Sequence, residues 1–226
     1  MITTLLPPIF SRLLVDKTFG VCSRLNAHGL TVLDLGAGTG IVSRKFLESK
    51  SLKSLLWVDI SPCDPKVFDH RLKFVTADAI KFLSDYSGPP FDLVLLIDFL
   101  EHLELSEVPT LLSLLSFHLH ADSIVLIQVP NGDSPVSLRN FNNDSTHKTY
   151  FGSRLLSDTL TSSGFFPGQP IPVFDRPFAS PILSIICGLF WVRFLYPFLS
   201  FLLFGFSLSN PNLFWSPNLA YVCRMS

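Results

Sequence analysis

The sequence predicts an α/β fold built on a doubly wound, mostly parallel sheet, and three observations support this prediction. Short apolar stretches that suit strands alternate with stretches that suit helices along most of the 226 residues. A glycine-rich turn directly follows the first of these strands. Polar side chains come at or just after the ends of five predicted strands, and parallel sheets bind their ligands at the carboxyl ends of the strands.

Length and charge narrow the class of protein. A chain of 226 residues fits one domain with room for an appendage. The net charge is −1 and the basic residues are scattered, which argues against a protein held on nucleic acid by phosphate contacts. Only 15% of the residues are charged, against about 25% in a typical soluble domain, so the chain carries an apolar excess.

The cysteines and the N-terminus indicate the compartment. The cysteines form neither a C-x-x-C pair nor a zinc-like cluster with histidine, so we expect free thiols in a reducing, cytoplasmic environment. The first ten residues hold two prolines and lack the basic start of a signal peptide. The four cysteines are Cys22, Cys63, Cys187 and Cys223.

Residues 9–27 predict a leading amphipathic helix. Apolar side chains alternate there with charged ones, and Gly29 suits a left-handed cap at the end of the helix. We expect this helix to cover the edge of the sheet or a ligand bound there.

The first strand, residues 31–35, ends in the turn Gly-Ala-Gly-Thr-Gly at residues 36–40, and a helical pattern follows from 41 to 48. Glycines allow a sharp bend and a close approach to a ligand, and the start of a helix offers free N–H groups. In the dinucleotide fingerprint the third glycine takes the sixth position. Here Ile41 stands at that position and the third glycine comes one residue early, at Gly40, which disfavours a nicotinamide enzyme.

Further strands are predicted at residues 55–59, 72–75, 91–97 and 123–129, with a last antiparallel strand at 218–224. A helix from 106 to 117, capped by Ser106, separates the fourth strand from the fifth. The polar side chains at or just after the strand ends are Asp34, Asp59, Asp78, Asp98 and Asn131. Asp59 stands about 20 residues beyond the glycines, where nucleotide-binding folds place an acid for the ribose hydroxyls.

The G-x-G-x-G turn with Asp34 two residues before it resembles the first motif of the class I S-adenosylmethionine-dependent methyltransferases. The resemblance extends over about residues 32–165 and is closest to the branch of ubiquinone-pathway O-methyltransferases and bacterial glycan-cluster enzymes. It implies a Rossmann-like sheet of seven strands and S-adenosyl-L-methionine as cofactor. It assigns cofactor binding to Asp34, Gly36, Ala37, Gly38, Thr39, Gly40, Asp59, Ile60, Asp78, Ala79 and Asp98.

The resemblance also implies roles for three acids: Asp34 contacts the amino-acid end of the cofactor, Asp59 the ribose and Asp78 the adenine. Methyl transfer to a hydroxyl needs a group that takes the proton. With these acids assigned to the cofactor, His147 in the polar loop 142–149 is the expected catalytic base. A structural role, as a helix cap or packed against Tyr150, is the alternative.

The motif Asp98-x-x-Glu101-His102 leaves a metal site open. The corresponding motif of the ubiquinone-pathway enzymes resembles a divalent-metal site near the acceptor, and these side chains could hold magnesium. Relatives with Glu-His at this point also work without a metal, so no metal ligand is assigned.

The apolar excess is concentrated in residues 177–209, between a methyltransferase domain at 1–176 and a returning last strand at 210–226. The run 178–206 is long enough to span a bilayer, but Arg193 lies near its middle, where a charge is costly. We therefore expect monotopic contact of a helical insertion with the membrane surface. A single transmembrane helix, a lid and a dimer interface are the alternatives.

The function expected from the sequence is S-adenosylmethionine-dependent methyl transfer, to an oxygen of a lipidic or membrane-associated acceptor. Two alternatives stay open. The chain could be a soluble small-molecule methyltransferase, or an inactive cofactor-binding scaffold at a membrane.

Overall fold

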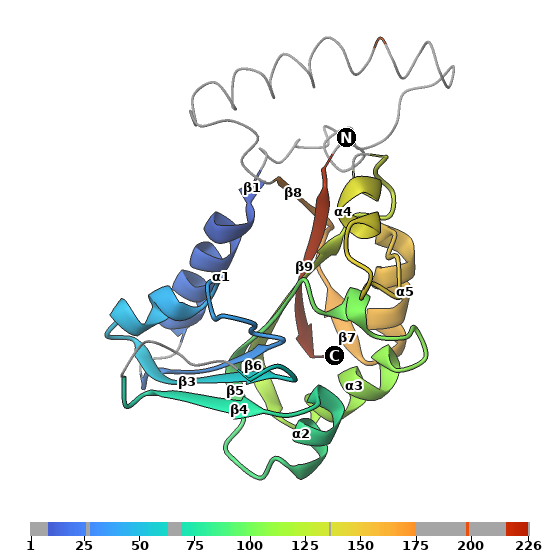
Figure 1. The fold of residues 1–226 in the computed structure, drawn as a ribbon. Coiled ribbons are helices and arrows are strands. Elements are labelled where there is room, and N and C mark those ends of the chain that lie inside the picture. Colours follow the sequence, from blue (N-terminus) through green and yellow to red (C-terminus); the bar gives the residue numbers. More distant parts are fainter. Residues whose placement is uncertain are drawn as a thin grey trace.

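A mixed sheet with helices on both faces forms the core of the protein (Figure 1). The computed structural model describes residues 9–25, 28–62, 69–135, 137–174, 198 and 216–225. The strands are β1 (Ile9–Phe10), β2 (Leu30–Leu35), β3 (Leu52–Asp59), β4 (Leu72–Thr76), β5 (Phe91–Ile97), β6 (Leu119–Pro130), β7 (Phe165–Pro167), β8 (Ile171–Phe174) and β9 (Asn218–Met225). The helices are α1 (Ser11–Leu25), α2 (Ala79–Asp85), α3 (Val108–Ser116), α4 (Leu138–Asn142) and α5 (Ser153–Ser162), with 3₁₀ helices η1 (Arg44–Glu48) and η2 (Leu100–His102).

The strand order β1-β8-β9-β6-β5-β2-β3-β4 confirms the doubly wound sheet. The pairs β3–β4, β2–β3, β2–β5 and β5–β6 are all parallel, and β9 runs antiparallel to β6, as expected for the last strand. The sheet has nine strands rather than the expected seven. The seventh strand position, beside β9, is divided into β7 and β8, and the short β1 adds an edge beyond β8.

The two faces of the sheet bury separate apolar clusters. Leu14 and Val15 of α1 pack with Phe46 of η1 on one face, whereas α2, α3 and α5 cover the other. The near-continuous apolar strands β5 and β6 lie between these layers, which explains why both of their faces are hydrophobic. Gly29 follows α1 with φ of 86°, in agreement with the predicted left-handed turn.

Two predicted helices begin later than the sequence indicated. After the glycine turn, residues 41–43 form a turn, and the helix that follows is the 3₁₀ segment η1. The Ser43 side chain, just before η1, is buried. α3 begins at Val108 with Glu107, not Ser106, at its N-cap position. The Glu107 carboxylate accepts a hydrogen bond from the Glu104 backbone N–H at 2.8 Å and so holds a turn before the helix.

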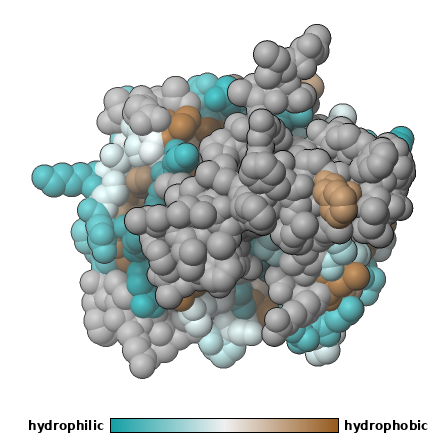
Figure 2. All heavy atoms as spheres, turned by 90° about the horizontal axis from the view of Figure 1, so that it is seen from above, coloured by the Kyte–Doolittle hydropathy of each residue, from teal (hydrophilic) through white to brown (hydrophobic). Residues whose placement is uncertain are grey.

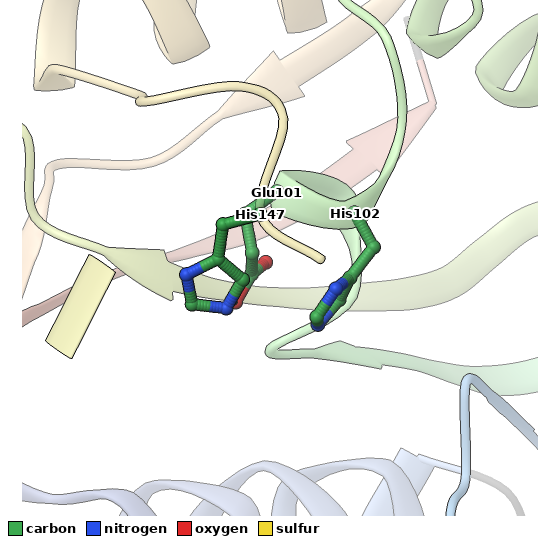
Figure 3. Close-up of side chains that lie close together, drawn as sticks. All are labelled: Glu101, His102 and His147. Atoms are coloured by element: carbon green, nitrogen blue, oxygen red, sulfur yellow. The ribbon is translucent and has the colours of Figure 1, made fainter. Parts of the chain in front are cut away.

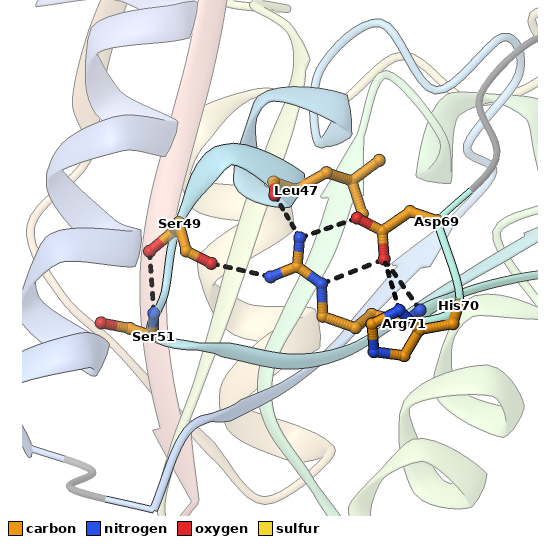
Figure 4. A network of polar contacts seen from close by, with 6 residues as sticks. All are labelled: Leu47, Ser49, Ser51, Asp69, His70 and Arg71. Carbon is orange, nitrogen blue, oxygen red and sulfur yellow. Dashed lines mark hydrogen bonds and ion pairs between the residues drawn. The ribbon is translucent and has the colours of Figure 1, made fainter.

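Arg71 fixes the connection around η1 (Figure 4). Its guanidinium donates to the carbonyl oxygens of Leu47 and Ser49, the latter at 2.9 Å, and to the Asp69 carboxylate at 2.7 Å. The hydrogen bonds that Arg71 donates to the Asp69 carboxylate, from its side chain and its backbone N–H, lower the pKa of Asp69 to about 2. The fork of Arg71 therefore ties the loop before β4 to the end of η1.

The hydrophobic insertion predicted at residues 177–209 lies outside the described residues, apart from Phe198. No helix in the described part of the chain is long and apolar enough to cross a membrane. Seen from above, described hydrophobic residues are visible in small separate areas, some of which border hydrophilic residues (Figure 2). Cys22 and Cys223 are free thiols, as expected, and both are buried, while Cys63 and Cys187 are not described.

Candidate active site at the carboxyl edge of the sheet

The glycine turn after β2 brings three left-handed residues together, with φ of 78° at Gly36, 54° at Gly38 and 67° at Gly40. A Cβ atom at Gly36 would lie 2.4 Å from the Phe99 ring, and one at Gly40 would lie 2.1 Å from the Trp57 ring. At Gly38 no described atom lies within 4 Å of that position. The outer two glycines are thus required by packing, and Gly38 is the one whose backbone a ligand can approach.

Asp34 lies beneath this turn with only 3% of its surface exposed. The buried Ser43 hydroxyl donates to its carboxylate, and the Trp57 indole N–H donates to the Ser43 oxygen at 2.7 Å. Burial raises the pKa of Asp34 to about 6, against the opposing effect of the Ser43 hydrogen bond. The sequence did not identify Ser43 or Trp57 as part of the site. We call Asp34, the turn 36–40, Ser43, Trp57 and Asp59 the turn region.

Asp59 is the last residue of β3 and contacts the glycine turn. Its two carboxylate oxygens accept hydrogen bonds from the backbone N–H groups of Gly38 and Ser61, both at 2.8 Å. A carboxylate oxygen accepts about two hydrogen bonds, so each oxygen keeps capacity for a ligand hydroxyl. The next side chain, Ile60, is 74% exposed and offers an apolar surface beside Asp59.

The remaining residues of the glycine turn and the segment after β4 lie at the same carboxyl edge of the sheet. The backbone N–H groups of Gly36 and Ala37 donate to Val58, and Thr39 continues the turn. Asp78 caps α2 by accepting a hydrogen bond from the Lys81 N–H at 2.9 Å, and the buried Ala79 begins that helix. A surface hollow of about 560 Å³ adjoins this segment; its lining includes Thr76, Asp78, Lys81, Phe82 and Tyr86.

Asp98, directly after β5, has φ of 51° and is the one described non-glycine residue with positive φ. Such a conformation costs free energy and persists where surrounding contacts enforce it. Its N–H donates to the Gln128 carbonyl at 2.9 Å, and the Gln128 side-chain amide donates to its carboxylate at 3.0 Å. Gln128 is the single polar residue in the apolar run 124–129 of β6, and this break in the run is the signal in the sequence that points to it.

Glu101, His102 and His147, the Glu101 cluster, lie together beyond Asp98 and point toward the same space (Figure 3). Glu101 is 1% exposed, and neither of its carboxylate oxygens has a hydrogen-bond partner among the described residues. Burial, together with the charge of Asp98, raises the pKa of Glu101 to about 8. One carboxylate oxygen lies 4.0 Å from His147 Nε2.

The loop that carries His147 is attached to η2. The Lys148 and Thr149 N–H groups donate to the Glu101 carbonyl at 2.7 and 3.0 Å, and the Thr149 hydroxyl donates to the Leu103 carbonyl. The predicted base His147 is therefore held against Glu101. Its ring packs against those of Phe141 and His102 and does not cap α5, whose N-cap is Gly152.

Asn131, the fifth polar strand end, has a structural task. Its side-chain amide donates to the Ser216 carbonyl at 3.1 Å and hydroxyl at 3.0 Å, and its N–H donates to the Pro217 carbonyl. These bonds join the end of β6 to the start of β9. The structure thus brings the turn region and the strand-end acids Asp78 and Asp98 to one edge, and Asn131 closes that edge.

Comparison with known proteins agrees with this geometry. The model of the methyltransferase domain family matches residues 10–166, more than half of the chain. A S-adenosylmethionine-dependent methyltransferase from Archaeoglobus fulgidus has a similar structure, with a TM-score of 0.63, 23% identity and 94% of each chain covered. No curated protein matches the sequence.

Two further solved structures share the fold. The 1,6-didemethyltoxoflavin-N1-methyltransferase of Burkholderia thailandensis, with its substrate and S-adenosylhomocysteine, has a TM-score of 0.59 at 18% identity over 96% of this chain and 76% of that one. Magnesium protoporphyrin IX methyltransferase from Synechocystis PCC 6803, with S-adenosylhomocysteine, has a TM-score of 0.56 at 15% identity over 95% and 83%. These comparisons do not select the ubiquinone-pathway or glycan-cluster branch. They do show that the chain belongs to the methyltransferase domain family and is, as the sequence predicted, an S-adenosylmethionine-dependent methyltransferase.

Proposed function

We propose that the protein transfers the methyl group of S-adenosylmethionine to an oxygen of a lipidic or membrane-associated acceptor. The observation that supports the acceptor class is the position of the described residues on either side of the hydrophobic run 178–206. β8 ends at Phe174, and the chain returns at Ser216, which Asn131 holds at the carboxyl edge. The chain therefore leaves β8 and returns to β9 at the carboxyl edge of the sheet, which is the edge that carries the candidate site. An apolar acceptor is proposed to enter there.

The turn region is the proposed binding site of the cofactor. Gly38 leaves room at the backbone, Asp59 retains hydrogen-bonding capacity for the ribose hydroxyls, and Ile60 offers an apolar surface for the adenine. Asp34, Ala37, Thr39, Asp78, Ala79 and Asp98 surround the same edge and complete the proposed set. The methyl group would face the Glu101 cluster, which lies next along the edge after Asp98.

His147 is the proposed proton acceptor. A backbone carbonyl can only accept, so the 3.1 Å contact with the Phe141 carbonyl means that His147 Nδ1 carries the proton and Nε2 has the free lone pair. As the acceptor oxygen forms its bond to the methyl carbon, the carbon–sulfur bond breaks and its electron pair stays on sulfur. The products are the methyl ether or ester and S-adenosylhomocysteine, and the hydroxyl proton passes to Nε2.

Labelled S-adenosylmethionine tests the proposal. The protein is incubated with the cofactor and with either an organic membrane extract or an aqueous metabolite extract. A matched variant replaces residues 178–206 by a short linker, which Val173 and Asn218 allow because they are paired neighbours in the sheet. We expect label in the organic extract with the full chain, and loss of that label with unchanged S-adenosylhomocysteine binding in the variant.

Two results would contradict the proposal in different ways. Label in the aqueous extract, unaffected by the deletion, would favour a small-molecule acceptor with the hydrophobic run as a lid or dimer interface. Binding of S-adenosylhomocysteine without label in either extract would favour a cofactor-binding scaffold.

A further inference from the structure

We propose that Glu101, His102 and His147 form a binding site for a divalent first-row transition-metal cation. One carboxylate oxygen and one nitrogen from each imidazole lie within 4.8 Å of one another (Figure 3). This is the one group of three or more histidine, cysteine or acidic side chains that converges in this way among the described residues. Two separate segments, η2 and the loop before Tyr150, supply the three ligands.

The Glu101 carboxylate points to a missing positive partner. It is 1% exposed, and both of its oxygens are buried without a hydrogen-bond partner in the described part of the chain. A buried polar atom without a partner costs free energy, and buried acids are normally paired or bound to a metal. A cation between Glu101 and the two histidines would provide that pairing.

The hydrogen bonds around His102 determine which of its ring nitrogens is unprotonated. The Thr146 hydroxyl has one proton, which it donates to the Asp144 carboxylate. The 2.9 Å contact between Thr146 and His102 Nδ1 therefore has His102 Nδ1–H as the donor. Nε2 of His102 is left as the unprotonated nitrogen, available to a metal ion.

His147 is arranged in the same way, because its Nδ1–H donates to the Phe141 carbonyl at 3.1 Å. Histidines that bind metals commonly donate their second ring N–H to a carbonyl or a carboxylate, directly or through a partner, and this bond fixes the tautomer. His147 Nε2 lies 4.0 Å from a Glu101 oxygen and 3.8 Å from an Asp144 oxygen. Ligands about 2.0–2.2 Å from one ion lie roughly 3–3.5 Å apart, so small side-chain rotations would close the site.

This ligand set differs from the one that the sequence motif suggested. Asp98 is not part of the converging group, and its carboxylate accepts the Gln128 amide. His147, 45 residues after His102 in the chain, takes its place. Two imidazoles and one carboxylate suit iron, cobalt, zinc or nickel, whereas magnesium and calcium prefer oxygen ligands alone.

Binding of the cation does not depend on the proposed function. Only a role of the cation in methyl transfer rests on the proposed function. A bound cation would lower the pKa of a hydroxyl that coordinates it. Nε2 of His147 would then serve as a ligand, and the proton-accepting role proposed above would apply to the metal-free protein. Direct binding measurements separate the two, because they need no acceptor.

Cobalt titration tests the site. Chelator-treated full-length protein is titrated with Co²⁺, and visible absorption and calorimetry are recorded. We expect one strong site with cobalt d–d bands, displaced by Zn²⁺ and not by an excess of Mg²⁺. Glu101→Gln, His102→Gln and His147→Gln should each weaken binding by about tenfold or more. His102 is partly exposed, so we expect its variant to disturb folding least.

Two control variants make the result specific. His70→Gln removes an exposed histidine outside the cluster, and Asp98→Asn removes the motif acid; both should bind Co²⁺ as the unchanged chain does. No strong binding, or equal binding by all three cluster variants, would overturn the proposal. Loss in Asp98→Asn with retention in His147→Gln would replace it by the motif site. S-adenosylhomocysteine binding, measured with chelator present, reports separately on the transferase function.

Discussion

Asp34 and Glu101 are both buried acids at the same edge of the sheet, but their surroundings differ. Asp34 receives the Ser43 hydroxyl, which is held in turn by the Trp57 indole. Neither Glu101 oxygen has such a partner among the described residues. Within the turn region, Asp34 is therefore paired inside the protein, whereas the Glu101 cluster lacks a component that a ligand would supply. Changes in the first should alter cofactor binding and stability, and changes in the second should alter catalysis.

The largest effect is expected at His147. His147→Ala should slow labelling of the acceptor by about 10²–10⁴, because a positioned proton acceptor is lost. Initial rates with saturating S-adenosylmethionine measure the effect, and S-adenosylhomocysteine affinity should not change. A normal rate would show that His147 is not the proton acceptor and would remove the contrast between the two regions.

The next effect concerns packing beneath the turn. Gly40→Ala would place a Cβ against the buried Trp57 ring in a left-handed conformation. We expect a loss of about 2–5 kcal/mol in the free energy of unfolding, from overpacking and backbone strain together. Urea unfolding measures it, and a variant as stable as the unchanged chain would show that Trp57 does not confine this turn.

Asp34→Asn should stabilise the protein at neutral pH. The folded-state pKa of about 6 lies above the ordinary 3.8, so the folded chain binds the proton more tightly than the unfolded chain. The stability contributed by this group falls as pH rises from about 4 to 6 and stays low above that range. A two-unit shift corresponds to at most about 3 kcal/mol.

An asparagine can still accept the Ser43 hydrogen bond, so this penalty should disappear. Unfolding free energies at pH 4.5 and 7.5 would show a gain mainly at the higher pH. An equal gain at both values would mean that ionisation of Asp34 is not its cause.

The smallest stability effect is expected at Gly38. No described atom obstructs a Cβ there, so Gly38→Ala should cost only about 1–2 kcal/mol from its positive φ. Cofactor binding should nevertheless fall, because the alanine side chain would block the path by which the cofactor approaches the backbone at residue 38. Comparison with Gly40→Ala separates a packing glycine from a ligand-facing one; retained S-adenosylhomocysteine binding in Gly38→Ala would contradict this assignment.

Local patterns in the sequence predicted the fold well. The apolar runs identified β5 and the antiparallel β9, and the glycine turn located the edge to which Asp34 and Asp59 belong. Side-chain contacts between distant segments could not be read in the same way. Ser43 beneath Asp34, and His147 beside Glu101, depend on how loops fold back on the sheet. The start of α3 was missed because Glu107 forms a turn with Glu104 that no helical pattern reveals.

Calorimetric titration with S-adenosylhomocysteine tests cofactor binding at the turn region most directly. The full chain, treated with chelator, is compared with Asp59→Ala and with Asp122→Ala, which removes an exposed acid of β6 outside the site. We expect micromolar binding by the full chain and by Asp122→Ala. Asp59→Ala should bind more weakly by about 1–3 kcal/mol, from lost hydrogen bonds to a charged group. Absence of binding in the folded full chain, or equal affinity in Asp59→Ala, would contradict a cofactor site at Asp59.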